Sequence, residues 1–340
     1  MGTQNRTTRA LLIGFCLALF ACRSNSIEGP QPDPLETECA VQSIGQEIVI
    51  CGERFSIDAP VVLWTDPNGY NGYSTERHFV DQPKLKKSPE PGTLRYDPGR
   101  VSRDGNRTQL VPADSRSVQQ LGEVVDQFVL HYDVCGASQS CFKVLHDHRG
   151  LSVQFMLDVD GTLYQTVDLR EQCWHATKAN TRSIGVEIAH IGGRGRRDLR
   201  QMESWYVRDA DGLRVQFPTW LGDGGVRTPD FIARPQRDFR LEGVIQGEHR
   251  FMYDYTPEQY ETLIRLSAVL CQVFPRMQPD APRDASGQVS DRVLSDGDFA
   301  GFGGILGHYH VQRNKVDPGV AFDWEPFLAR VRERIRRAPL

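Results

Sequence analysis

Apolar runs with strand character, separated by a helical segment and a hairpin signal, place the strongest limit on the fold of this chain. The run VVDQFVLHY (residues 124–132) is mostly apolar and ends in polar groups, which is typical of a buried strand. SCFKVLHDH (140–148) has helical spacing, and LSVQFMLDVDGTLYQTVD (151–168) predicts a hairpin that turns at Asp160-Gly161. SIGVEIAHI (183–191) predicts another strand. Strands interleaved with helices predict an α/β fold around a mixed sheet.

Two amphipathic segments near the C-terminus predict longer helices. Thr256 is a candidate N-cap, Pro257 lies in the first turn, and Gln259 closes a capping box before apolar residues that recur through Leu270. A last helix is predicted over about residues 324–335, with a basic end that suits the helix dipole.

The N-terminus predicts export. Arg6 and Arg9 precede an uncharged stretch from 10 to 21, which is too short to span a bilayer. We therefore interpret residues 1–21 as a signal peptide.

The end of this signal resembles a bacterial lipobox, in which cleavage precedes a cysteine that becomes lipidated. Residues 19–22 read LFAC, and a polar tether follows at 22–35. Because Arg23 follows Cys22, the resemblance points to an exported protein anchored through Cys22 at the periplasmic face of the outer membrane. An ordinary signal peptide with an incidental cysteine is the alternative.

Length and charge limit the organisation and the partners. Without the signal, about 320 residues remain, slightly above the size at which one core stops growing. We expect a catalytic domain at 121–340 with an insertion at about 192–250, and an N-terminal extension at 36–120 that packs on it. A formal net charge of −4 argues against nucleic acid as a partner. We expect a monomer.

The cysteines predict disulfides. Of eight, Cys16 leaves with the signal and Cys22 takes the lipid, so six remain in an exported chain. Proximity and elimination predict the pairs Cys39/Cys51, Cys135/Cys141 and Cys173/Cys271. None of these cysteines has the CxxC spacing of a structural zinc site.

A catalytic zinc site needs three ligands from His, Cys, Asp or Glu and one position for water. Spacing alone does not select the ligands, because HExxH is absent from the sequence. Glu187 stands out, since a carboxylate between apolar strand residues is costly to bury unless it is paired or catalytic. The candidates at strand ends and in loops are His131, His175, Glu187, His190, His308, His310 and Asp317.

The stretches FVLHY, DVDGTLYQTVD, CWHATKAN, SIGVEI and GHYHVQRNKVDPGVAFDW follow one another along the chain. In this order they resemble the type 2, zinc-dependent N-acetylmuramoyl-L-alanine amidases, whose fold is shared with peptidoglycan recognition proteins. The resemblance implies a central mixed β-sheet flanked by helices. It also implies one Zn²⁺ per chain, peptidoglycan or muropeptides as substrate, and hydrolysis of the amide between N-acetylmuramic acid and the L-alanine of the stem peptide.

The resemblance assigns three kinds of site residue. The zinc ligands are His131, His308 and Asp317. The catalytic groups are Glu187, which moves the proton, and Lys315, which stabilises the oxyanion. The groove residues are Trp174, His175 and Asn180. The pair Cys135/Cys141 resembles a disulfide common in the recognition proteins.

His310 leaves the ligand choice open. On a strand, His308 and His310 would point to the same face, and both could bind a metal. We favour His308, because it follows Gly307 as the family ligand does. His310 is then exposed or lies behind a ligand.

Two other functions stay open. A non-catalytic peptidoglycan-binding protein of the same fold usually lacks a ligand, whereas the full ligand set is present here. A lipoprotein zinc hydrolase acting on another amide is separable only by substrate tests. Gln154 stands where bacterial relatives often have His, and Val153 where some have a catalytic Tyr, which leaves Glu187 as the proton carrier.

Overall fold

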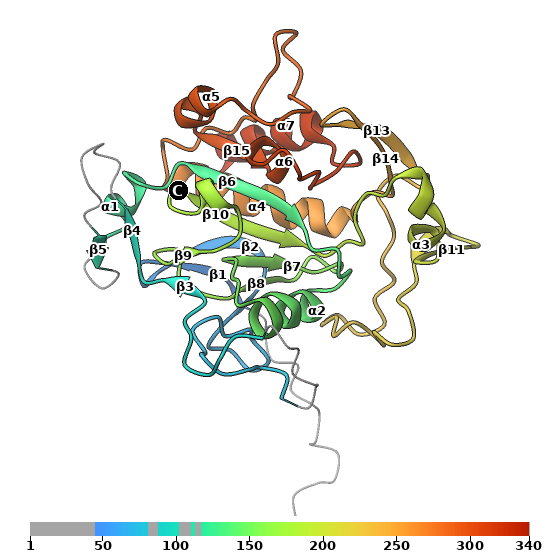
Figure 1. Ribbon diagram of the computed structural model, residues 1–340, viewed down its shortest axis with the longest axis horizontal. Coiled ribbons are helices and arrows are strands. Elements are labelled where there is room, and N and C mark those ends of the chain that lie inside the picture. Colours follow the sequence, from blue (N-terminus) through green and yellow to red (C-terminus); the bar gives the residue numbers. More distant parts are fainter. Residues whose placement is uncertain (1–44, 81–87, 102–109, 113–116, 340) are drawn as a thin grey trace, which may run out of the picture. The chain divides into compact units, whose positions relative to one another are not determined.

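The computed structural model describes all residues except 1–44, 81–87, 102–109, 113–116 and 340 (Figure 1). The predicted signal peptide, Cys22, the tether and Cys39 lie outside the described residues. The described residues belong to one compact unit. Among the helices of the described part, none is long and apolar enough to cross a membrane.

A seven-stranded mixed sheet forms the centre of this unit, in the order β1-β2-β8-β7-β10-β6-β15. Neighbouring strands are parallel, except for β1 with β2 and β7 with β8. The predicted α/β fold with a central mixed sheet is therefore confirmed. The strands are β1 (Gly45–Ile50), β2 (Glu53–Leu63), β6 (Gln127–Tyr132), β7 (Phe155–Leu157), β8 (Leu163–Gln165), β10 (Ser183–Ile188) and β15 (Gly304–Gly307).

Helices cover both faces of the sheet. Side chains alternate along each strand, so a strand whose residues are all apolar needs a partner on each face. Phe155 and Leu157 of β7 point into the main core, whereas Met156 joins a second cluster with Phe142. Helix α2 (Ser138–Phe142), continued by a π-helical segment (Lys143–Arg149), covers the second face.

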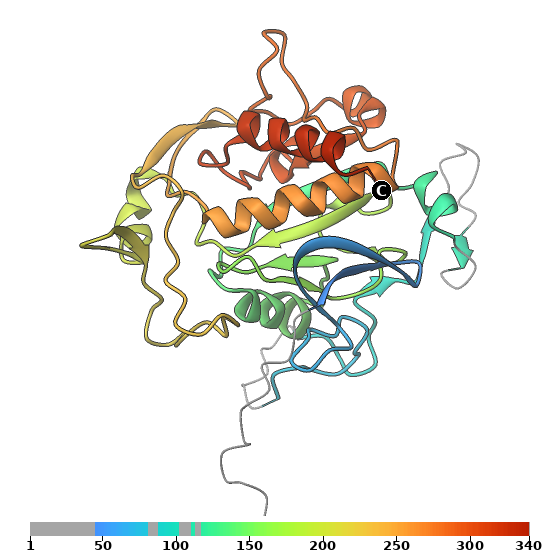
Figure 2. The same ribbon diagram turned by 180° about the vertical axis from the view of Figure 1, so that it is seen from behind.

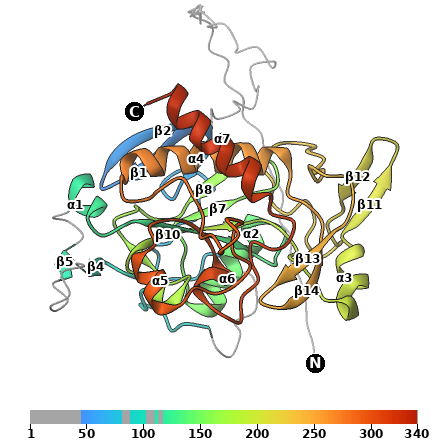
Figure 3. The same cartoon turned by 90° about the horizontal axis from the view of Figure 1, so that it is seen from above.

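The main core lies under α4 (Pro257–Val273) and α7 (Trp324–Arg337), which lie side by side (Figures 2 and 3). The predicted capping box of α4 is present: Gln259 N donates to Thr256 Oγ at 3.1 Å, and Thr256 N donates to Gln259 Oε1 at 3.0 Å. Both predicted C-terminal helices are confirmed.

The described part of the N-terminal extension is built into the sheet. Strand β2 pairs with β8, and β3 (Tyr96–Asp97) pairs with β9 (Gln172–Cys173). The fully buried Arg100 donates to five backbone carbonyls in residues 169–183. These contacts anchor the extension at several independent points.

The remaining short elements lie in the loops and in the insertion. The insertion carries two hairpins, β11/β12 and β13/β14. The elements are β4 (Gly99–Val101), β5 (Leu110–Pro112), α1 (Val118–Gly122), 3₁₀ turns at Thr177–Ala179 and Arg196–Asp198, α3 (Leu199–Glu203), β11 (Tyr206–Asp209), β12 (Gly212–Val215), β13 (Leu241–Ile245), β14 (Glu248–Met252), α5 (Asp296–Gly301) and α6 (His308–Val311).

Two of the three predicted disulfides are corrected by the structure. Cys135 and Cys141 are free thiols: Cys135 forms a hydrogen bond with the Ser140 side chain, while Cys141 packs in the apolar cluster under α2. Cys173 and Cys271 are also free thiols. They belong to different parts of the fold, since Cys173 lies on β9 and Cys271 packs in the main core on α4. Burial raises the pKa of each of these last two thiols to about 12. The pair Cys39/Cys51 stays a prediction, since Cys39 is not described.

Candidate functional site

The register of the central strands brings the predicted site residues together. Glu187 on β10 lies directly beside His131 on β6. Strand β15 runs parallel to β6 on its other side, and its last residue, Gly307, pairs with Leu130. Because the carboxyl ends of parallel strands meet at one edge of a sheet, the chain leaves β15 at His308, next to His131.

His131, His308 and Asp317 converge on one point. His131 Nδ1 lies 2.9 Å from His308 Nδ1, and each nitrogen lies 3.0 Å from Asp317 Oδ2. The loop with Asp317 is tied to α6, since Tyr309 N donates to the Asp317 carbonyl at 3.2 Å. In the described part of the chain this is the only group of such side chains close enough to share a metal ion.

The electrostatics of this cluster suit a cation. Burial, with the neighbouring His308, lowers the pKa of His131 to about 4, so its imidazole is neutral at pH 7. Burial would raise the pKa of Asp317, but His308 and His131 outweigh it and hold that pKa below its ordinary value. A neutral imidazole and an ionised carboxylate are the forms that coordinate metals.

Outer hydrogen bonds orient both imidazoles. With Nδ1 facing the cluster, the Nε2–H of His308 donates to Gln312 Oε1 at 2.7 Å. The Nε2–H of His131 donates to His175 Nδ1 at 2.9 Å, and His175 Nε2 lies 3.3 Å from Ser183 Oγ. Such partners fix the tautomer and the ring orientation of metal-binding histidines.

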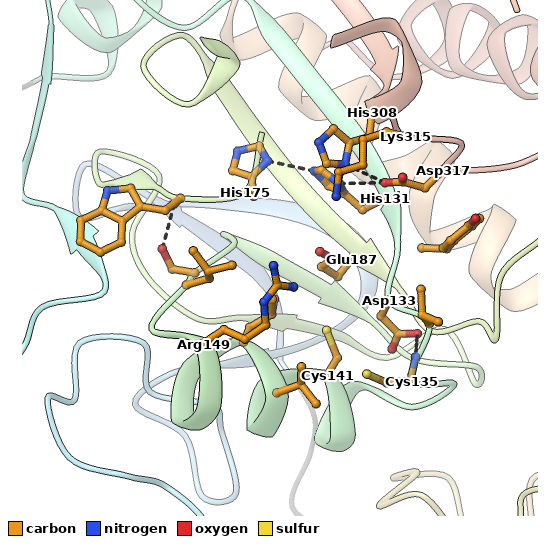
Figure 4. Close-up of a pocket in the computed structure, with 17 residues that line it drawn as sticks. His131, Asp133, Cys135, Cys141, Arg149, His175, Glu187, His308, Lys315 and Asp317 are labelled. Carbon is orange, nitrogen blue, oxygen red and sulfur yellow. Dashed lines mark hydrogen bonds and ion pairs between the residues drawn. The ribbon is translucent and has the colours of Figure 1, made fainter. Parts of the chain in front are cut away.

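A cavity of about 150 Å³ opens beside the cluster (Figure 4). Its polar lining joins the cluster to the predicted catalytic groups and to two of the predicted groove residues. The lining includes His131, Asp133, Arg149, Ser152, Trp174, His175, Glu187, His308, Lys315 and Asp317.

Glu187 lies in this cavity between the cluster and Arg149 (Figure 4). Burial, followed by the charges of Asp317 and Asp133, raises its pKa well above the ordinary value; Lys315 and Arg149 act in the opposite direction. A buried carboxyl group beside a cluster that could hold a metal ion is a candidate for accepting and returning a proton.

Asn180 has a local role in the structure. Its Oδ1 accepts from the backbone N–H of His175 at 3.2 Å and of Ala176 at 2.6 Å, which shapes the loop after β9. Of the predicted groove residues, Trp174 and His175 line the cavity, whereas Asn180 does not.

The structure decides whether His308 and His310 point to the same face, as they would on a strand. Both residues lie in the short helix α6, where positions two apart differ by about 200° and do not share a face. His310 is fully buried, accepts from Gly307 N at 3.0 Å, and donates from Nε2 to Ser290 O at 2.8 Å. Both of its ring nitrogens are therefore occupied away from the cluster, and it is not exposed.

Replacing His310 with alanine should therefore leave the metal content unchanged, whereas His308→Ala should lower it strongly. His310→Ala removes two buried hydrogen bonds, so its melting temperature should fall by several degrees. Metal analysis of the two purified variants tests this. Loss of metal from His310→Ala, with retention in His308→Ala, would reverse the ligand choice.

Two residues of the site were not predicted from the sequence: Asp133, which lines the cavity, and Gln312, which contacts His308. Asp133 Oδ1 accepts from the backbone of Cys135, Gly136 and His190, and Oδ2 has no partner among the described residues. Gln312, which orients His308, follows it by four residues. Residues four apart lie on the same face of a helix, but the sequence analysis predicted no helix over these residues.

Comparisons with known proteins point to one family. Residues 120–211 match the family model described as N-acetylmuramoyl-L-alanine amidase. No curated protein sequence matches the chain.

Solved amidase structures resemble the chain loosely. The N-acetylmuramyl-L-alanine amidase AmiD from E. coli, in complex with the substrate anhydro-N-acetylmuramic acid-L-Ala-D-gamma-Glu-L-Lys, is 16% identical, with 68% of this chain and 65% of that chain covered and a TM-score of 0.37. AmpDh3 from Pseudomonas aeruginosa, in complex with anhydromuramic pentapeptide, is 17% identical, with 68% and 75% covered and a TM-score of 0.36. The chain thus spans just under two thirds of the AmiD chain.

These superpositions are too loose to support the assignment, which rests on the family match and on the site. His131 and Glu187 lie inside the matched residues, and the fold brings His308 and Asp317 to them from outside that range. Residues 120–211 therefore belong to a domain of the N-acetylmuramoyl-L-alanine amidase family.

Proposed function

We propose that this protein is a zinc-dependent hydrolase that cleaves the amide between N-acetylmuramic acid and the L-alanine of the peptidoglycan stem peptide. The observation that carries the proposal is the placement of Glu187 and Lys315 in the same cavity as the His131–His308–Asp317 cluster, in a chain with an amidase family domain.

The donor set fits Zn²⁺. Two imidazole nitrogens and one carboxylate oxygen lie within 4.8 Å of one another, which is the ligand set and count of a catalytic zinc site. When bound, Zn²⁺ polarises the amide carbonyl and lowers the pKa of water to about 7. His131, His308 and Asp317 would hold it.

Glu187 and Lys315 supply the remaining chemistry. An amide has a weakly electrophilic carbonyl and a poor leaving group, so hydrolysis needs proton transfer to the departing nitrogen. Glu187 accepts the proton of the attacking water and passes it to that nitrogen, while the Lys315 ammonium group stabilises the negative oxygen.

Mass spectrometry after digestion of purified peptidoglycan and of an anhydromuropeptide tests this function. We expect free stem peptides and intact glycan. Released disaccharides would indicate a glycosidase, binding without products would indicate the non-catalytic alternative, and cleavage of unrelated amides alone would indicate a different amidohydrolase.

We also propose that the mature protein is a lipoprotein of the outer membrane, anchored through Cys22. The support is the sequence LFAC at 19–22 and the polar stretch that follows it. Labelling with a fatty-acid analogue should tag the wild type but not Cys22→Ser. Cys16→Ser is the matched control and should still be labelled, because Cys16 leaves with the signal. Equal labelling of the wild type and Cys22→Ser would contradict the anchor.

A further inference from the structure

We infer that the N-terminal extension supports the lining of the substrate pocket from outside and that Asp97 is the positioning residue that fixes Trp174. Trp174 lines the cavity beside the metal-binding cluster. The family match begins at residue 120, so Asp97 belongs to a segment outside the matched domain. The inference rests on the proposed function for its substrate, a muropeptide.

The Asp97 carboxylate holds the indole directly. Trp174 Nε1 donates to Asp97 Oδ2 at 2.9 Å, and Gln172 Nε2 donates to the same oxygen at 2.6 Å. Asp97 is brought there by strand pairing, because β3 and β9 are antiparallel with Asp97 opposite Gln172. Hydrogen bonds to an ionised acceptor are stronger than those between neutral groups, so one carboxylate can restrain both side chains.

The backbone of Trp174 is tied to the same segment. Trp174 N donates to Ser152 Oγ at 3.0 Å, and the Ser152 hydroxyl donates to the Arg95 carbonyl at 2.5 Å. Both the main chain and the indole of Trp174 are thus fixed by residues 95–97. Without these bonds, a partly exposed tryptophan in a loop would sample other rotamers.

Arg95 links the extension to a second wall of the cavity. Its buried guanidinium donates from Nε to the His146 carbonyl at 2.8 Å and from Nη1 to the Thr93 carbonyl at 2.8 Å. His146 belongs to the π-helical segment whose residues Leu145 and Arg149 line the cavity. The extension therefore supports two separate parts of the lining.

A purely structural role for the Asp97 contact is the competing explanation. The extension is also held by the pairing of β2 with β8 and by the five carbonyl contacts of Arg100, so the fold does not depend on Asp97 alone. One of the two side chains that donate to Asp97 is Trp174, a residue that lines the cavity. An aromatic face placed there can pack on the sugar or peptide of a muropeptide and thereby favour binding.

The first test of this inference needs no substrate. In ¹⁵N-labelled protein the indole resonance of Trp174 is identified by its absence in Trp174→Phe. In Asp97→Ala this resonance should shift upfield and exchange faster with water, whereas Asp97→Asn, which keeps an acceptor oxygen, should restore much of the shift. Asp66→Ala is the matched control, because Asp66 lies in the same extension and accepts from Leu63 N. An unchanged indole resonance in Asp97→Ala would overturn the positioning role.

The second test uses muropeptide hydrolysis by the full chain. Asp97→Ala should raise KM about tenfold while kcat stays within about twofold, because an interaction that serves binding is lost. Trp174→Phe, which lacks the indole donor, should raise KM too, and the double variant should be no worse than the more affected single variant. A wild-type KM in Asp97→Ala would refute the pocket role. If the wild type itself does not hydrolyse muropeptides, the proposed function fails, and the indole resonance still decides whether Asp97 fixes Trp174.

Discussion

Asp317→Ala is expected to lose most of the bound zinc and all measurable amide hydrolysis. Asp317 is the only carboxylate in the cluster, and its Oδ2 lies 3.0 Å from both ligand nitrogens. Without this carboxylate, two neutral imidazoles would hold a divalent ion with no compensating negative charge. Metal analysis and the muropeptide assay on the same preparation measure the two losses.

Asp296→Ala is a matched control for Asp317→Ala. Its side chain is 99% exposed and forms an ion pair with Lys178, and exposed pairs contribute little to stability. This variant should keep its zinc and its activity. Chelator treatment of the wild type should reproduce the Asp317→Ala defect, and added Zn²⁺ should reverse it in the wild type alone. A full zinc content in Asp317→Ala would remove this residue from the ligand set.

Glu187→Gln should keep zinc near the wild-type level and lower turnover by about 10²- to 10⁴-fold, the usual contribution of a general acid–base. Glutamine preserves the size of the side chain but cannot accept the proton. Because Glu187 lies in the cavity without belonging to the His131–His308–Asp317 cluster, its replacement should separate proton transfer from the proposed metal binding. Single-turnover kinetics beside metal analysis make the measurement.

Full turnover in Glu187→Gln would be incompatible with the proposed mechanism. Loss of zinc from this variant would instead make Glu187 a ligand. Glu171→Gln is a useful control, because Glu171 is also a buried carboxylate near the sheet but bonds to Tyr73 and Arg170 away from the cavity. This variant should keep normal turnover once its folding has been verified.

Local sequence patterns were sufficient to predict the strands and helices that carry the site. The apolar run that ends at His131 and the alternating run around Glu187 are both strands, and the capping box at Thr256 begins a helix. Each pattern depends on residues within one turn or one strand, where side-chain periodicity and backbone hydrogen bonds determine the element. The type of each element and its buried face could therefore be predicted without knowing which other segment packs against it.

Patterns failed where the outcome depends on distant contacts. The sequence did not indicate which element follows Gly307, and the segment forms a short helix in which His310 is hydrogen-bonded to Gly307 N and to Ser290 O. Cysteine spacing suggested a bridge between Cys135 and Cys141, but bridging also needs the two sulfurs to face each other, and both are free thiols. The contact of His310 with Ser290 and the relative orientation of the two cysteines both depend on tertiary packing, which the residues next to them in the sequence do not determine.

The fold class and the strand positions of His131 and Glu187 could be predicted from sequence patterns, and the family resemblance selected His308 and Asp317 as candidate ligands. Packing between distant segments brings these residues together, because β15 must pair with β6 to place His308 beside His131, 177 positions earlier in the chain. It also decided the contact of Asp97 with Trp174, 77 positions apart, through the pairing of β3 with β9. Periodicity reports how a segment meets a core, whereas register and packing between segments determine which side chains share a cavity.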